Sequence, residues 1–423
     1  MKGLASDSAA EWRKFYMLPI AACLGYSTAG IHVYGIGVYI QPISAEFGWS
    51  RTLTVAGLTI ALVVEAAVAV PVGMLVDRIG PRRLAIVGML LTGGAFALLG
   101  TTTGEATSWY RLWALVGLCD ALIQITVWTS AVATRFEASR GLAFGVTLSG
   151  ASLGTAVFPY LGTILVAAVG WRRAFAAQAG LWILVAFPLV VLFFRGAKDS
   201  QRGTRARARA KGERPVLNGA SLLRGLRSTI YVRLLMVSLL FTLTTLPLVV
   251  HFVPLLTSNG FNAKRAAGIT AVLGICAFIG RFGSGILLDR FRPTLVGAGV
   301  FLLPAVGCST LLATGYSTVS AIAAAVLIGL SAGAELDVVC YLTSRYFDRK
   351  SYGALLGGLL VAMTVGAATG PLGAAWIFDT YRSYALLLWL TVTLTVTSSL
   401  VLTTLPRPEI DGSTREPSSS PAQ

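Results

Sequence analysis

The sequence predicts an all-α membrane protein in which twelve transmembrane helices form two six-helix repeats. Three observations lead to this fold class: the composition, the number of long apolar stretches and a similarity between the two halves of the chain. Of the 423 residues, 55% are hydrophobic and only 12% are charged, whereas about 25% of the residues of a typical soluble domain are charged. The composition therefore excludes an ordinary soluble enzyme.

Twelve apolar stretches are long enough to cross a membrane, which takes about 20 mostly apolar residues for ~30 Å of hydrocarbon. In the first half they are residues 15–44, 52–76, 84–103, 109–134, 142–167 and 174–194, and in the second half 230–256, 266–288, 294–313, 318–342, 353–377 and 382–405. The first stretch is too long for a signal-peptide core and lacks a small-residue cleavage site followed by a soluble domain. It is expected to remain as a membrane span.

The two halves of the chain resemble each other. A shift of 212 residues superposes Gly73 on Gly285, Asp77 on Asp289, Arg78 on Arg290, Pro81 on Pro293, Gly141 on Gly353, Gly145 on Gly357, Gly154 on Gly366 and Pro159 on Pro371. Residues 1–195 and 230–406 are therefore expected to form two six-helix halves. Transport folds are often built from such repeats, with the substrate bound between them near the middle of the bilayer.

The basic residues predict the orientation in the membrane. With the N-terminus inside, 26 of the 34 Lys and Arg fall in cytoplasmic segments, 7 fall in outer loops and one, Arg281, lies within a span. Short loops rich in Lys and Arg stay in the cytoplasm. Both termini are therefore expected inside a plasma membrane, the inner membrane in a bacterium, and the net charge of +16 needs no nucleic-acid partner.

Two polar segments flank the second half. Residues 196–229 are strongly basic, without apolar periodicity, and are expected to form a flexible cytoplasmic linker; the alternative is a regulatory contact with anionic lipid headgroups. Residues 407–423 are expected to form a cytoplasmic tail.

The sequence lacks the motifs of common enzyme families. It has no P-loop, no HExxH and no GxSxG, and its five cysteines lie in apolar spans without a CxxC pair. We therefore expect no catalytic residue, no cofactor, no metal site and no disulfide.

Two related loops indicate the family. Gly73 to Arg83 reads GMLVDRIGPRR, and Gly285 to Pro293 reads GILLDRFRP. The first closely resembles the signature loop of the major facilitator superfamily, and the resemblance extends over the whole chain. It implies the major facilitator fold and a cytoplasmic gate that latches in the outward-open state. The gate residues so implied are Gly73, Asp77, Arg78, Gly80, Arg82, Asp289 and Arg290, with a weaker latch in the second copy, where Phe291 and Arg292 replace the Ile-Gly step.

Shorter pieces indicate a branch of that superfamily. EFGWSR at residues 46–51, SRGLAFG at 139–145, GWRRAF at 170–175 and IGRFGSGILLDR at 279–290 resemble the monocarboxylate porter and oxalate/formate antiporter-like branch. The resemblance implies that Arg281 binds a substrate carboxylate, to which a guanidinium presents a matching planar fork. It also places a histidine, His251, beside the substrate. The alternatives are an ion pair of Arg281 with a buried acid such as Asp120, and a structural role for His251.

Other ionisable residues within the spans are candidates for function, because charges at membrane depth are costly and usually face a cavity or a partner. Ala277 and His32 stand where animal carriers of the branch have an acid and a lysine, so the proton carrier must lie elsewhere. Apolar surroundings favour the protonated form of a carboxyl group, which makes Asp120 the first candidate. The other candidates are Glu335 and Asp337, which point roughly 200° apart on a helix. Glu65 is the last candidate, and its alternative role is that of a buried neutral acid at a tight helix crossing. His32 and Tyr34 are added to the candidate substrate ligands, although tyrosines also anchor helices at interfaces.

The function expected from these residues is proton-coupled uptake of an organic monocarboxylate by alternating access. The candidate substrates are small, aromatic and lactone-type catabolic acids. The expected partners are the organic anion, protons and the lipid bilayer, and the chain is expected to act as a monomer. Two alternatives stay open: an exporter of drugs or metabolites from the same superfamily, and a transporter-like membrane sensor without net flux.

Overall fold

The structure is a computed structural model, which describes residues 2–196, 225–347 and 349–406. Within these ranges every regular element is a helix. Most of the predicted linker, residues 197–224, and all of the predicted tail, residues 407–423, lie outside the described residues.

The N-terminal half consists of the helices before the linker. They are α1 (Lys2–Phe15), α2 (Met17–Ala29), α3 (Ile31–Gly35), η1 (Ile36–Val38), α4 (Ile40–Phe47), α5 (Arg51–Ile79), α6 (Pro81–Leu98), η2 (Leu99–Thr101), α7 (Ala106–Asp120), η3 (Ala121–Ile123), α8 (Ile125–Ala133), α9 (Arg140–Leu148) and α10 (Gly150–Phe193). One core of buried side chains joins them, from Leu18 to Phe194, with Val250 as its contact from the other half.

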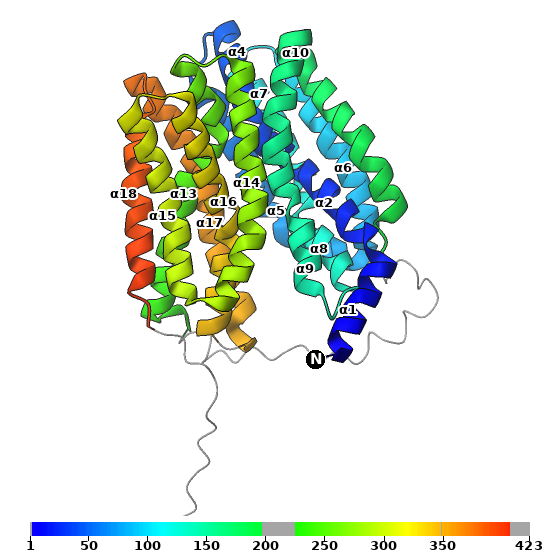
Figure 1. The fold of residues 1–423 in the computed structure, drawn as a ribbon. Coiled ribbons are helices and arrows are strands. Elements are labelled where there is room, and N and C mark those ends of the chain that lie inside the picture. Colours follow the sequence, from blue (N-terminus) through cyan, green and yellow to red (C-terminus); the bar gives the residue numbers. More distant parts are fainter. Residues whose placement is uncertain (1, 197–224, 348, 407–423) are drawn as a thin grey trace, which may run out of the picture.

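The C-terminal half consists of six long helices. They are α13 (Thr229–Ser258), α14 (Ala263–Arg290), α15 (Pro293–Thr314), α16 (Thr318–Tyr346), α17 (Arg349–Tyr381) and α18 (Ala385–Thr403). Two clusters of buried side chains hold them together. Figure 1 shows this half beside the N-terminal half.

The predicted spans can be followed in the structure. Ten helical stretches of the described residues are long and apolar enough to cross a membrane. One of them contains α10, in which Gly170 has a non-helical backbone (φ 77°, ψ 157°) and separates the fifth predicted span from the sixth. The first predicted span is the remaining one, and it is broken into α2, α3, η1 and α4. The all-helical fold class is thus confirmed, and the twelve predicted spans are consistent with the helices.

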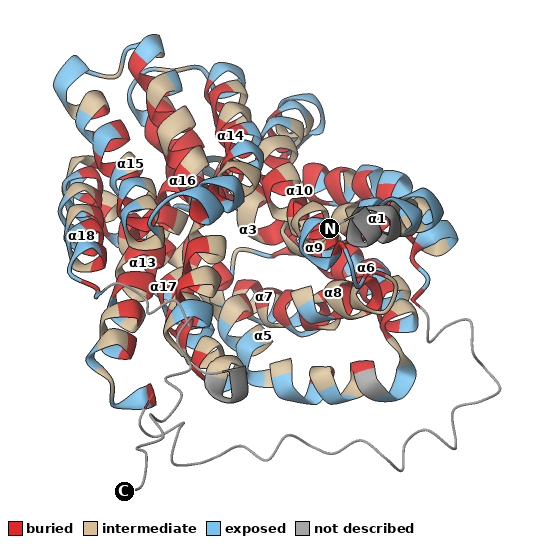
Figure 2. Ribbon diagram, turned by 60° about the horizontal axis from the view of Figure 1, so that its bottom comes forward, coloured by how far each residue is buried: buried red, intermediate tan, exposed pale blue. Residues whose placement is uncertain are grey.

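Burial follows the pattern expected of a bundle in lipid. Figure 2 shows buried residues on the inner faces of the helices and exposed residues on the outer faces. The outer faces carry large apolar side chains, among them Val70, Leu184 and Val319, each more than 70% exposed. An apolar exterior of this kind is stable against hydrocarbon rather than water.

The two halves come together through closely packed helices. α5 packs against α17, and α10 packs against α14. At Gly274 of α14 a Cβ atom would lie 2.2 Å from the backbone nitrogen of Ala156 in α10, so only glycine allows this crossing. Gly37 of η1 likewise approaches the carbonyl oxygen of Val250 in α13. Backbone contact thus joins the halves without intervening side chains.

The two ends of the bundle differ. We call the end with the α5–α6 and α14–α15 turns and the N-terminus the terminus side, and the end with the α4–α5 and α17–α18 turns the far side. In Figure 1 the ribbons of the two halves diverge toward the terminus side and meet at the far side.

The helix α1 was not predicted, and one carboxylate holds it against the bundle. Glu11 accepts hydrogen bonds from the backbone nitrogens of Glu137, Ala138 and Ser139 at 2.9–3.1 Å, and from the Ser139 hydroxyl at 2.8 Å. These donors lie just before α9. The hydrogen bonds from Ala138 and Glu137 lower the pKa of Glu11 to about 2.

We predict that Glu11→Ala destabilises this contact. Because the folded-state pKa lies below the ordinary value of 4.5, the contribution of Glu11 to stability is present above pH 4.5 and is lost as the pH falls toward 2. The melting temperature of the variant should therefore be lower than that of the wild type near neutral pH, and the difference should shrink on acidification. Amide exchange at residues 137–139 should speed up on the order of fivefold. Identical exchange in both proteins would show that Glu11 does not hold the loop.

Candidate functional site

A central cavity of about 570 Å³ lies between the two halves. Its lining comes from α2, α3, α5, α7, α8 and α10 of the N-terminal half and from α13, α16 and α17 of the C-terminal half. Four predicted site residues line it: His32, Tyr34, Glu65 and Asp120. The volume is that of a pocket for a small organic molecule.

One cluster of ionisable groups belongs to the N-terminal half. His32, Glu65 and Asp120 each place a ligand atom within 4.8 Å of the others, close enough to hold a cation. His32 Nδ1 lies 3.9 Å from Asp120 Oδ1, and both side chains are almost fully buried. The sequence predicted neither this meeting nor a metal site, because the three residues come from three different spans.

The helices that carry the cluster are interrupted beside it. His32 lies in the five-residue helix α3, and Asp120 ends α7 just before η3. Gln124, between η3 and α8, has an extended backbone (φ −57°, ψ 162°), and its amide nitrogen donates to the carbonyl oxygen of Glu65 at 3.3 Å. The fourth predicted span is therefore interrupted at this point. Broken helices at membrane depth are tolerated where they line a cavity.

A second set of charges belongs to the C-terminal half. Arg281 Nη1 of α14 lies 3.6 Å from Asp337 Oδ1 of α16, and the arginine side chain is 9% exposed. The Nε and Nη1 atoms of Arg281 find no hydrogen-bond partner among the described residues. Glu335 turns to another neighbour and accepts a 2.5 Å hydrogen bond from Thr242 of α13. The two acids point to different partners, as their spacing predicts, and the buried acid beside Arg281 is Asp337 rather than Asp120.

His251 lies in a hydrogen-bonded chain that reaches the far side. Its Nε2 is 3.0 Å from the carbonyl oxygen of Pro371, and its Nδ1 is 2.9 Å from the Tyr384 hydroxyl. Because a carbonyl only accepts, Nε2 carries the hydrogen and Nδ1 accepts from Tyr384. Arg51 in turn donates to the tyrosine oxygen at 2.6 Å. In this conformation His251 is fully buried and does not line the central cavity, so its role as a substrate ligand stays a prediction.

An acid of the C-terminal half caps a helix of the N-terminal half. The Asp379 carboxylate accepts from the backbone nitrogens of Arg51 at 3.0 Å and Thr52 at 2.7 Å, and from the Thr52 hydroxyl at 2.5 Å. The next free nitrogen of α5, that of Leu53, is capped by Ser50. These are the unpaired donors at a helix N-terminus, where negative charge is also favoured. We call Arg51, Thr52, Asp379 and Tyr384 the far-side latch.

Sequence analysis did not find the far-side latch. Arg51 was noted only as the end of the EFGWSR piece, and Asp379 is a lone acid after the eleventh predicted span. The signal that was available is the pair of opposite charges at the outer ends of spans two and eleven. The Arg51 guanidinium also stacks 3.4 Å from the Phe378 ring.

On the terminus side the predicted gate loops lie apart. A Cβ atom added at Gly73 or Gly285 would meet no atom within 4 Å, and Arg78, Asp289 and Arg290 are exposed. Gly80 links α5 to α6 at φ 93°, a conformation that favours glycine. Arg82 donates to the carbonyl oxygen of Val191 at 2.6 Å. The side chain of Asp77 lies outside the described part, so its predicted pairing stays a prediction.

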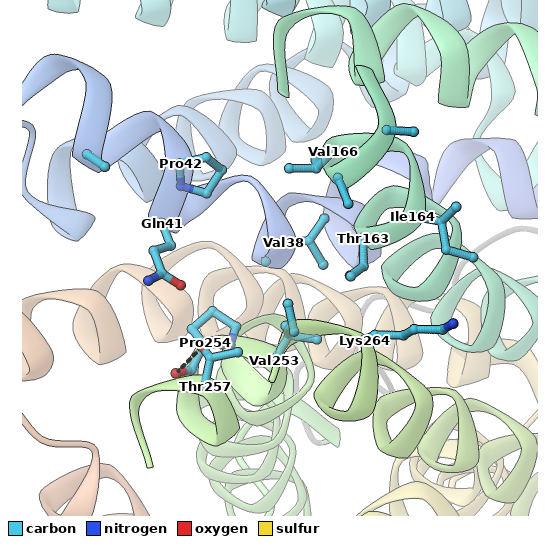
Figure 3. A pocket seen from close by; sticks show the side chains of 15 residues that line it. Val38, Gln41, Pro42, Thr163, Ile164, Val166, Val253, Pro254, Thr257 and Lys264 are labelled. Carbon is cyan, nitrogen blue, oxygen red and sulfur yellow. Dashed lines mark hydrogen bonds between the residues drawn. The ribbon is translucent and has the colours of Figure 1, made fainter. Parts of the chain in front are cut away.

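A second groove of about 730 Å³ lies at the far side. Figure 3 shows its walls, which come from η1, α4 and α10 of one half and from α13 and α14 of the other. They are mostly apolar, with Gln41 and Lys264 among the polar side chains. Its lining includes none of the predicted site residues. The central cavity, which four of the predicted site residues line, is therefore the candidate site.

Comparison with protein families gives one match. The profile described as Major Facilitator Superfamily matches residues 22–336.

Individual proteins agree with that match. The 3-(3-hydroxy-phenyl)propionate transporter of Escherichia coli strain K12 is 27% identical over 367 residues, which cover 84% of each chain. The chloramphenicol resistance protein of Streptomyces lividans is 27% identical over 394 residues, covering 88% of this chain and 94% of that protein. Among solved structures, the D-xylose-proton symporter shares the fold with a TM-score of 0.70 at 15% identity, covering 93% of this chain and 98% of the other.

We predict that Asp379→Asn weakens the far-side latch. The change keeps the shape but removes the charge that stabilises the N-terminus of α5 and binds its nitrogens. Hydrogen bonds to a charged group contribute about 1.5–3 kcal/mol, so the population open at the far side should rise about tenfold or more. Spin labels at Thr103 and Lys264, on opposite halves, should report longer distances. Glu105→Gln, an exposed acid on the same side, is the control, and equal distance distributions for Asp379→Asn and wild type would refute the latch.

Proposed function

The chain belongs to the major facilitator superfamily, and from this premise we propose that it takes up an organic monocarboxylate together with protons by alternating access. Membership makes it a multi-pass membrane transporter rather than an enzyme. In the proposal it acts as a monomer in the plasma membrane, with the terminus side and both termini in the cytoplasm.

The arrangement of the two halves supports alternating access. With the terminus side in the cytoplasm, the described conformation faces inward, because the far-side latch holds the outer ends of α5 and α17 together. The gate loops of the terminus side would then close only in the opposite state. Their exposed charges and the open surroundings of Gly73 and Gly285 fit this assignment.

The observation that carries the proposed substrate class is the underpaired Arg281. It is a buried, permanently charged group, and its only ion pair is the 3.6 Å contact with Asp337 among the described residues. Two of its nitrogens await an acceptor. A substrate carboxylate would supply two acceptor oxygens in the plane of the fork. Arg281 also lies within electrostatic range of Tyr26 and Tyr34, which line the central cavity.

The cavity and one relative bear on the size of the substrate. A volume of about 570 Å³ admits an aromatic acid as well as a lactate-sized one. The E. coli relative is named for a phenyl-substituted propionate, which is an organic monocarboxylate. Tyr34 lines the same cavity and is the proposed polar contact for the rest of the substrate, with His251 as a contact in another conformation. His32, the third predicted contact, also lines the cavity but faces Asp120.

The candidate proton carriers are the four acids within the spans. Asp120 and Glu65 line the cavity from the N-terminal half. Glu335 and Asp337 face Thr242 and Arg281 in the C-terminal half. Acids within membrane spans commonly form the proton relays of transporters.

Export of amphipathic compounds is the second candidate function. The match to a chloramphenicol resistance protein over 88% of this chain favours it. The two functions differ in their dependence on Arg281. An exporter of uncharged compounds would tolerate the loss of this charge, whereas a carboxylate importer would not.

We predict that Arg281→Gln abolishes proton-driven uptake. The protein is reconstituted in liposomes with an inward proton gradient, and uptake of labelled lactate, benzoate and 3-phenylpropionate is followed. Removing a buried charge that pairs with a ligand costs about 2–5 kcal/mol, so uptake should fall at least about thirtyfold. Arg281→Lys should retain part of the activity, because it keeps the charge but loses the planar fork.

The control is Arg265→Gln, an exposed arginine at the other end of α14, and it should transport like the wild type. Gradient-dependent uptake that survives in Arg281→Gln would overturn the carboxylate role. If no acid of the panel is taken up, export of chloramphenicol-like compounds becomes the leading function.

A further inference from the structure

The buried cluster of His32, Glu65 and Asp120 lacks the partners that its polar atoms require. His32 is 0% exposed. Its ring lies near the backbone carbonyl of Ala29, but neither ring nitrogen completes a hydrogen bond with a described residue. Asp120 is 2% exposed, and its Oδ1 likewise has none. Buried polar atoms are nearly always hydrogen-bonded. Two unpartnered groups that face each other at 3.9 Å therefore indicate a ligand between them.

The charge of the cluster defines the ligand as a cation. Two carboxyl groups this close in an apolar environment cannot both be ionised without a positive charge beside them. Asp120 is also the last residue of α7, where the helix dipole is negative and favours positive charge. Ends of interrupted helices serve as cation and proton sites in other membrane transporters.

The number of ligand atoms favours a proton over Ca²⁺ or Mg²⁺. Ca²⁺ takes six to eight oxygen ligands and Mg²⁺ an octahedron, whereas the described residues supply one imidazole nitrogen and two carboxylate oxygens. The 3.9 Å between His32 Nδ1 and Asp120 Oδ1 exceeds a hydrogen bond. A proton on either atom would draw the two into a charge-assisted hydrogen bond of about 2.7–2.9 Å.

Other titratable groups lie near the cluster. Tyr26 of α2 lies within electrostatic range of Glu65, Asp120 and Arg281. Tyr34 of α3 lies within electrostatic range of Arg281 and Glu335. Cys119 precedes Asp120 on α7 and interacts electrostatically with its carboxyl group. Arg281 is the one permanent cation in this group, so it sets the background field for both halves.

We propose that His32, Glu65 and Asp120 form a single proton-binding site that shares the transported proton, and that His32 serves this site rather than the substrate. A hydronium ion in the cavity gives its proton to His32 Nδ1, where an N–H bond forms and donates to Asp120 Oδ1, while water is left behind. The proton returns to water when the cluster faces the other side. The inference deepens the proposed function and rests on its proton coupling.

This site is separate from the anion site. The cluster belongs to α3, α5 and α7, whereas Arg281 and its partner Asp337 belong to α14 and α16. Proton and anion would thus be held by different halves across one cavity. Closure of the halves around both ligands then couples them without direct contact.

Nuclear magnetic resonance can test the site without any substrate, because the chain contains only two histidines. The full-length protein is labelled with ¹⁵N-histidine, and the ring signals are followed against pH in nanodiscs. An opposite charge within about 4–6 Å changes proton affinity by about one to three pH units. Asp120→Asn should therefore weaken proton binding at His32 about tenfold to thousandfold, and Glu65→Gln should change it by less.

His251, whose two nitrogens are hydrogen-bonded elsewhere, reports in the same spectra that the fold is intact. Glu105→Gln, an exposed acid just before the α7 helix that carries Asp120, is the matched control and should leave the His32 titration within about threefold. An unchanged His32 titration in Asp120→Asn would overturn the shared site. A shift of the His32 signals on adding NaCl or ZnCl₂ at constant pH and ionic strength would show that the site binds a metal ion, and would overturn the proposal of a proton site.

The outcome is separable from that of the uptake assay. A titration that depends on Asp120 supports the site even if every acid of the substrate panel fails. Conversely, suppose that uptake is lost in Arg281→Gln while the His32 titration is unchanged in Asp120→Asn. That combination would place the transported proton on another acid.

Discussion

Ionisable side chains within an apolar bundle must find partners there, and this constraint shapes the whole molecule. Three solutions occur in the described residues. The Asp379 carboxylate accepts hydrogen bonds from backbone nitrogens at a helix end, and the Glu335 carboxylate accepts one from a hydroxyl. Arg281 makes only a loose ion pair. The first two are structurally complete. The incomplete ones are Arg281 and the His32 cluster. The cluster lines the central cavity, where a ligand can complete it, and Arg281 lies within electrostatic range of Tyr26 and Tyr34 in the cavity wall.

The sequence predicts the number and position of the spans well, because about 20 consecutive apolar residues have few other uses. It predicts the repeat from residues such as Pro81 and Pro293, each of which begins a helix after a loop. The helix α1 escaped prediction because the carboxylate that docks it, Glu11, bonds to residues more than 120 positions away. The breaks at Gly30 and Gln124 escaped because hydropathy is blind to backbone angles.

The candidate site was only half predictable for the same reason. The sequence indicated which residues are ionisable within the membrane. All of them are buried or partly buried, namely His32, Glu65, Asp120, His251, Arg281, Glu335 and Asp337. It could not indicate which of them meet. The pairing of Arg281 with Asp337 rather than Asp120, and of His251 with Tyr384, depends on how helices from distant parts of the chain cross.

The cap that Asp379 places on α5 makes secondary structure a property of the whole molecule. The first turn of α5 satisfies one nitrogen with its own Ser50 and leaves two to the other half. When the halves part at the far side, that turn is left to fray or to recruit water. The rate of opening is then governed by the hydration of a helix end, so reduced water activity would slow the transition even in the absence of substrate.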